Sequence, residues 1–76
     1  MEQVILWDKI LPAFAAALAI GLCALATGLA QSRIGAAGAG TLAEKPELAG
    51  TIIILLAIPE TMVILGFVVA AMILLQ

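Results

Sequence analysis

Hydrophobic positions fill two long runs of this chain, and a short polar break separates them. The first uncharged run is Ile10–Ser32, and the second is Leu48–Gln76, in which Glu60 is the only charged residue. A helix needs about 20 apolar residues to cross the hydrocarbon of a bilayer, so each run is long enough for one crossing. The pattern therefore predicts an all-α membrane protein, a helical hairpin of two transmembrane helices.

The break between the runs is the polar segment Glu44-Lys45-Pro46-Glu47. Proline is disfavoured inside a helix but tolerated in its first turn, and Glu47 suits the positive end of a helix dipole. We predict the first helix over about residues 3–43, a loop over about 44–46 and the second helix over about 47–75. At about 1.5 Å per residue the first helix is roughly 60 Å long. This length exceeds the bilayer, so the loop end should project into water.

The composition agrees with a membrane protein. The 76 residues are 66% hydrophobic and 11% charged, with a mean hydropathy of +1.33, which excludes disorder and argues against a soluble domain. The net charge of −2 gives no electrostatic reason to expect nucleic acid as a partner. The single cysteine, Cys23, cannot form an intrachain disulfide, and we expect it to be a small packing residue.

The first helix carries a stripe of small residues at alternating steps of four and three, which fall on one helical face. Its members are Ala17, Gly21, Ala24, Gly28, Gln31, Gly35 and Gly38. Glycine costs about 1 kcal/mol against alanine in a helix, and small stripes let backbones approach closely. The stripe therefore predicts side-by-side copies of the hairpin, with packing inside one hairpin as the alternative.

Polar groups meet at membrane depth if the hairpin turns near Lys45. Gln31 lies 14 residues before Lys45 and Glu60 lies 15 residues after it, so both stand roughly 21–22 Å from the turn. Thr61 adds a hydroxyl, and the backbone carbonyl near Ile58 adds another oxygen beside the helix-loosening proline at position 59. These oxygens suit a hard cation, and they suit a protonated carboxyl group equally.

Glu60 is the candidate functional residue, because a charge at the centre of a membrane helix costs about 2.5–3.5 kcal/mol. A neutral or ion-loaded Glu60 could face lipid, whereas an ionised one needs water or an opposite charge, which is the property of an ion carrier. The alternative is a polar contact that only locks helices together. Arg33 is about 200° around the helix from Gln31, so we expect it to reach water or headgroups rather than Glu60.

Other sequence features set orientation and exclude chemistry. Arg33 and Lys45 lie toward the loop, so the positive-inside rule places the loop in the cytoplasm. The segment Gly35–Thr41 is spaced like a phosphate loop but has no lysine before Thr41 and no preceding strand. We therefore expect neither nucleotide binding nor catalytic residues in this chain.

These residues carry a family resemblance over about residues 15–75. The chain resembles the c-subunit, or proteolipid, of a rotary ATP synthase or ATPase. The stretches that match are Gly28–Gln31, Gly35–Gly40, Ala43–Glu47, Pro59–Thr61 and Gly66–Ala70. The Pro-Glu-Thr context is most similar to the archaeal or vacuolar-type branch, which also occurs in bacteria.

The resemblance implies a homo-oligomeric ring in a prokaryotic plasma membrane, with the first helix inside and the second outside. It implies that Glu60 binds and releases an ion opposite the arginine of a stator a-type subunit, and that ion flow turns the ring. The loop residues Glu44, Lys45, Pro46 and Glu47 would dock on central-stalk subunits. The resemblance assigns no cofactor to the chain, only the transported H⁺ or Na⁺.

The identity of the ion stays open between two alternatives. In sodium-binding relatives a glutamine level with the acid and a hydroxyl after it are ligands, and Gln31 and Thr61 match these positions beside Glu60. Such sites often have a tyrosine one turn beyond the acid, and this chain has none. Proton-translocating relatives carry the same glutamine and threonine. We predict protons, with sodium as the alternative.

Two other classes of protein use related features. A small proton-coupled exporter also has an intramembrane glutamate, but it usually needs about four crossings and aromatic residues for a drug pocket. This chain has two crossings and three aromatic residues. A structural or pore-forming hairpin such as a holin is the other class. It does not explain why Gln31 and Glu60 lie at the same depth in the membrane. A ring of many copies would favour the rotor over both.

Overall fold

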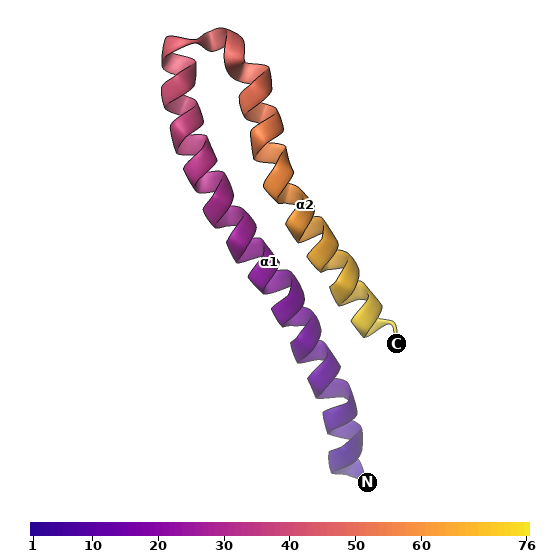
Figure 1. The fold of residues 1–76 in the computed structure, drawn as a ribbon. Coiled ribbons are helices and arrows are strands. Elements are labelled where there is room, and N and C mark those ends of the chain that lie inside the picture. The colour runs from indigo at the N-terminus through magenta and orange to yellow at the C-terminus, as the bar shows by residue number, and fades with distance from the viewer.

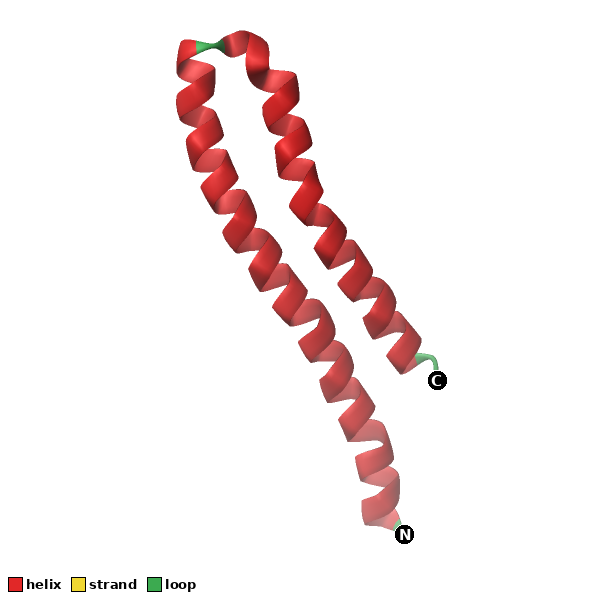
Figure 2. Ribbon diagram, in the orientation of Figure 1, coloured by secondary structure: helices red, strands yellow, loops and turns green.

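The computed structural model describes all residues, 1–76, as two antiparallel helices joined by a tight turn (Figure 1). Helix α1 spans Glu2–Glu44, the 3-10 turn η1 spans Pro46–Leu48, and α2 spans Ala49–Leu74. Figure 2 shows loop only in the short link between α1 and η1 and at the chain ends. The hairpin measures 65 × 16 × 8 Å. Both termini lie at the end opposite the turn, where α1 extends beyond α2 (Figure 1).

The turn is built around Pro46. Proline disfavours helical backbone at the residue before it, and Lys45 leaves the helix with φ −134° and ψ 78°. The Lys45 N–H still donates to the Thr41 carbonyl at 2.7 Å, and the Leu48 N–H donates to the Lys45 carbonyl at 3.1 Å. Since η1 takes up the residues after Pro46, α2 begins at Ala49, two residues after the predicted start of the second helix.

Small residues bring the two helices into close contact. The buried residues are Ala16, Thr27, Gly38, Pro59, Gly66 and Ala70. A Cβ atom added at Gly66 would lie 2.7 Å from the Cys23 Sγ, and one added at Gly38 would lie 2.6 Å from the Ile52 Cγ2. No glycine in the chain has a positive φ. These two glycines therefore serve close approach of the helices rather than a turn.

One face of α2 is turned toward α1 along its whole length. The buried and half-buried positions on this face repeat every seven residues, as Ile52, Pro59, Gly66 and Ile73 and as Leu56, Val63 and Ala70. A repeat of this kind keeps one seam of a helix facing its partner. The seam includes Pro59, so the residue that follows it, Glu60, lies beside the contact and is exposed on the flank of the hairpin.

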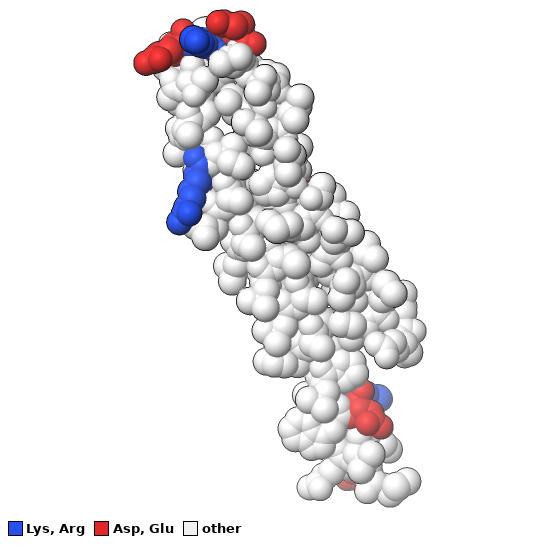
Figure 3. Space-filling model, in the orientation of Figure 1, with Lys and Arg blue, Asp and Glu red and all other residues white.

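Large apolar side chains point away from the hairpin. Leu25 is 73% exposed, Leu65 64% and Phe67 63%. Figure 3 shows that charged side chains gather at the turn and toward the N-terminus, and that on the face in view one basic side chain interrupts the uncharged shaft between them. Both helices are long and apolar enough to cross a membrane, and only 11% and 6% of their most apolar windows are buried within the hairpin. This surface fits lipid and neighbouring membrane helices, since water would meet it at a large free-energy cost.

Candidate ion-binding site

The hairpin brings the amide of Gln31 to the carboxyl group of Glu60. The Gln31 Nε2 donates to the Glu60 Oε2 at 2.8 Å and to the Leu56 carbonyl at 3.1 Å. Gln31 is half-buried against α2, whereas Glu60 is exposed. The two groups that the position of the turn predicts to be level are therefore in direct contact.

The Leu56 carbonyl decides which end of the Gln31 amide faces Glu60. A carbonyl oxygen only accepts hydrogen bonds, so the amide NH₂ must be the group that meets it. The same NH₂ then supplies its second hydrogen to Glu60. The amide nitrogen of Gln31 therefore faces Glu60, and the predicted role of the amide oxygen as an ion ligand stays a prediction. The sequence pattern does not locate the backbone acceptor that lies beside the amide.

Thr27 is a polar residue of this region that the sequence reasoning missed. It is 4% exposed, and its Oγ1 donates to the Pro59 carbonyl on α2 at 2.9 Å. A signal was present, because Thr27 is the only hydroxyl residue before Gln31 in the first apolar run. It also lies four residues before Gln31, on the same face of α1.

The other predicted ligands lie on α2 next to Glu60. The Thr61 Oγ1 donates to the Ile58 carbonyl at 2.7 Å within its own helix, and no hydrogen bond joins Thr61 to Glu60 or Gln31. Pro59 lies within α2 without interrupting it, although it has no N–H to donate to the Leu55 carbonyl. The structure thus joins Gln31 to Glu60 directly and leaves the Ile58 and Thr61 oxygens as a separate pair beside them.

The hairpin uses only part of the small stripe on α1. Gly38 is buried against Ile52, but a Cβ atom at Gly21, Gly28 or Gly35 would meet nothing within 4 Å. The alanines of the stripe, at positions 17 and 24, are exposed. Contacts inside one hairpin therefore account for Gly38 and for the Gln31 side chain, but not for the other glycines and the alanines of the stripe.

Charged residues outside the site lie on exposed surface. The four loop residues are exposed at the turn, where acidic and basic side chains lie together (Figure 3). They are Glu44, Lys45, Pro46 and Glu47. Arg33 is also exposed, which fits the expectation that its side chain reaches away from Glu60.

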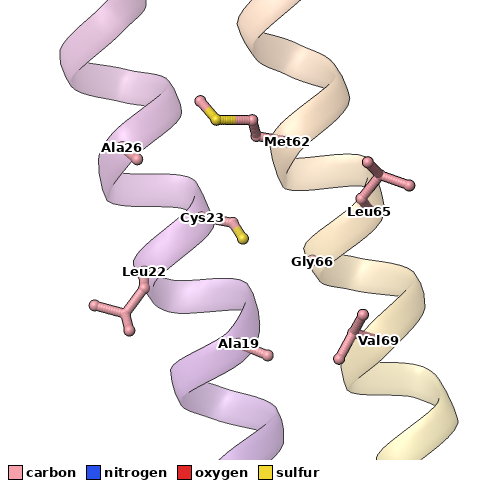
Figure 4. Close-up of a pocket in the computed structure, with 8 residues that line it drawn as sticks. All are labelled: Ala19, Leu22, Cys23, Ala26, Met62, Leu65, Gly66 and Val69. Atoms are coloured by element: carbon pink, nitrogen blue, oxygen red, sulfur yellow. The ribbon is translucent and has the colours of Figure 1, made fainter.

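An apolar groove lies between the helices on the side of the site away from the turn (Figure 4). Its volume is about 460 Å³, and residues of both helices line it, among them Leu22 and Cys23 of α1 and Leu65 and Gly66 of α2. None of the lining side chains carries an oxygen atom. The groove can hold hydrocarbon or apolar side chains, and it adds no ligand to the ion site.

Comparison with known proteins identifies the family that the chain matches. A family profile that describes the C subunit of ATP synthase matches residues 14–73. The chain is 45% identical over 65 residues to A-type ATP synthase subunit K of Methanocaldococcus jannaschii, covering 86% of this chain and 30% of that protein. It is 45% identical over 61 residues to V-type sodium ATPase subunit K of Enterococcus hirae, covering 80% and 39%. The chain thus spans roughly a third of the length of these relatives.

Proposed function

The chain belongs to the family of ATP synthase C subunits, and from this premise we propose that it is the ion-carrying rotor subunit of an archaeal- or vacuolar-type rotary ATP synthase or ATPase. Copies of the hairpin form a ring in the membrane. Glu60 of each copy takes up an ion and releases it where the ring faces the stator. Ion flow then turns the ring and is coupled to ATP synthesis or hydrolysis in the peripheral sector.

The observation that carries this proposal is the contact between Gln31 and Glu60 on the flank of the hairpin. The carboxyl group is exposed to whatever surrounds α2, and Gln31 holds one of its oxygens at 2.8 Å. Inside a membrane such a group faces lipid at low cost only when a proton or cation neutralises it. A rotating carrier needs a carboxyl group that is held in place, lies on the outer flank and can exchange its ion.

The open part of the small stripe supports the ring. Each glycine in a helix costs about 1 kcal/mol relative to alanine, and a Cβ atom at Gly21, Gly28 or Gly35 would meet nothing within 4 Å in the hairpin. Neighbouring hairpins that pack closely along the stripe would supply the missing contacts. In this arrangement α1 lies inside the ring, and α2 with Glu60 lies outside it.

The partners follow from the same arrangement. A stator a-type subunit would face Glu60 and supply the opposite charge, an arginine, when the carboxyl group is empty. The exposed turn at residues 44–47 would dock on the central stalk. This docking places the turn in the cytoplasm, and we assign the complex to the plasma membrane of a prokaryote.

We propose the proton as the coupling ion, with sodium as the alternative. The Leu56 carbonyl holds the Gln31 amide so that it offers hydrogens to Glu60, which suits a carboxylate or the unprotonated oxygen of a neutral carboxyl group. A sodium ion at the same place would need the amide oxygen, and both hydrogen bonds of the amide would break to turn it. Sodium is kept as the alternative because one relative is named a sodium ATPase.

Carbodiimide labelling tests the site and the ion together. The reagent is apolar and reacts with protonated carboxyl groups, so we expect mass spectrometry of membranes containing the intact complex to find the label at Glu60. The other four acidic residues, Glu2, Asp8, Glu44 and Glu47, serve as internal controls. Sodium that slows the labelling at constant pH would identify a sodium site, and labelling that responds to pH alone would support the proton. Label on the other acids with Glu60 unmodified would contradict the proposal.

A further inference from the structure

Thr27 is buried in the hairpin, yet no part of the ion-carrying step uses it. Its hydroxyl donates to the Pro59 carbonyl at 2.9 Å, across 32 positions of sequence. At 4% exposure it cannot bond to solvent, and a hydroxyl without a partner in an apolar contact is costly. The bond to Pro59 therefore constrains both helices at the residue that immediately precedes Glu60.

Thr27 and Gln31 act on α2 as a pair. Thr27 donates to the Pro59 carbonyl, and Gln31, one turn later on α1, donates to the Leu56 carbonyl, about one turn earlier on α2. This crossing order is the one that antiparallel helices require. The other contacts along the seam are mostly between apolar groups, which lack the directionality of a hydrogen bond. Both hydrogen bonds form together in only one register and one rotation of α2.

The bond from Thr27 lies at the proline inside α2. Pro59 cannot donate to the Leu55 carbonyl, so the helix lacks one of its own hydrogen bonds immediately before Glu60. The bond from Thr27 does not restore that hydrogen bond, but it ties Pro59 to α1 at the same point. Bending or rotation at this point would move the Glu60 carboxyl group away from Gln31.

We propose that Thr27 is a positioning residue for the ion carrier: its hydroxyl holds Pro59 against α1 and so keeps the Glu60 carboxyl group at the Gln31 amide. Thr27 does not touch the ion. The inference rests on the proposed function of Glu60 and assigns the alignment of that residue to a hydroxyl on the other helix.

Three substitutions at Thr27, made in the intact complex in membrane vesicles, separate the hydrogen bond from packing. Thr27→Val keeps the shape and removes the hydroxyl, Thr27→Ser keeps the hydroxyl and removes the methyl group, and Thr27→Cys leaves a weak donor. We expect ion-driven ATP synthesis to fall about three- to tenfold with valine, as for loss of one hydrogen bond between membrane helices. Serine should restore the rate to within about twofold of the original, and cysteine should give an intermediate rate. A packing role predicts the reverse order of valine and serine.

Thr41→Val is the matched control, because the Thr41 hydroxyl donates to the Ala37 carbonyl in its own helix at 3.1 Å. We expect this variant to match the original protein. Infrared spectra with a ¹³C-labelled Glu60 carboxyl group provide the positioning signal. The carboxyl band should shift in Thr27→Val and should stay in place in Thr27→Ser and Thr41→Val, since only the first loosens the contact with Gln31.

The outcomes distinguish this inference from the proposed function. Original rates and an unmoved Glu60 band in Thr27→Val would overturn the positioning role, as would a serine variant more impaired than the valine variant. If the valine variant fails to assemble, serine must still exceed cysteine, and the reverse order overturns the inference. Retained ATP synthesis in Glu60→Gln, in contrast, would remove the proposed function itself.

Discussion

Gly66 on α2 and Gly28 on α1 both lie within membrane helices, but a side chain would meet different surroundings at the two positions. A Cβ atom at Gly66 would lie 2.7 Å from the Cys23 Sγ and 3.1 Å from the Ala19 carbonyl oxygen. A Cβ atom at Gly28 would meet nothing within 4 Å. Gly66 is thus required by the contact between the two helices of one chain, and Gly28 is not.

The difference separates two kinds of contact in one small protein. The inner seam, defined by Thr27, Gly38, Pro59 and Gly66, closes the hairpin and includes the residue that precedes Glu60. The open stripe is defined by Ala17, Gly21, Ala24 and Gly28. It lies on the neighbouring face of α1, offset by one residue from the face that packs against α2, and it contributes little to packing within the hairpin. Since glycine is unfavourable in a helix, the open stripe needs a partner outside the chain. Substitutions in the inner seam should therefore destabilise the single hairpin, and substitutions in the open stripe should disrupt assembly of the ring.

The largest effect is expected from Gly28→Leu in the open stripe. A leucine side chain has free space in the single hairpin, so the hairpin should fold in detergent with unchanged helix content. In a ring it would separate neighbouring backbones, and we expect assembly to be lost when copies are counted by native mass spectrometry. Gly28→Ala is the matched control, because alanine already occupies positions 17 and 24 of the stripe. Rings that form normally with leucine would show that the stripe is not an interface.

A smaller effect, on the stability of the single hairpin, is expected from Gly66→Ala in the inner seam. The added methyl group collides with Cys23 and approaches a backbone carbonyl, and overpacking of this kind costs about 1–3 kcal/mol. Thermal unfolding of the hairpin in detergent should show this loss, whereas Gly28→Ala should show none. Adding Cys23→Gly to Gly66→Ala removes the sulfur and the Cβ atom and should recover part of the stability. Equal stability of the Gly28→Ala and Gly66→Ala hairpins would remove the distinction between the two sets.

Much of the fold and the central pair of the site follow from counting along the chain. The polar break with Pro46 locates the turn, and the turn makes Gln31 level with Glu60 because both helices rise by the same distance per residue. The contact at 2.8 Å agrees with this arithmetic. Height along a helix can be predicted in this way because it depends only on the position of the turn.

Rotation around the helix axis could not be predicted in the same way. Whether Thr27 faces α2 depends on which side of α1 the second helix packs against, and the small residues on two adjacent faces make either side plausible from sequence. The orientation of the Gln31 amide likewise depends on the Leu56 carbonyl, a backbone atom that carries no sequence signal. The start of α2 at Ala49 depends on the 3-10 turn that Pro46 introduces.

Ion-driven ATP synthesis by a Glu60→Gln complex tests most directly whether Glu60 is the exchangeable carrier. Glutamine keeps the size of the side chain and can still accept a hydrogen bond from Gln31, but it cannot gain or lose a charge. We expect the ring to assemble and ATP synthesis to be abolished, while Glu2→Gln in the exposed N-terminal segment keeps the original rate. Ion-coupled synthesis that persists in assembled Glu60→Gln rings would contradict the account.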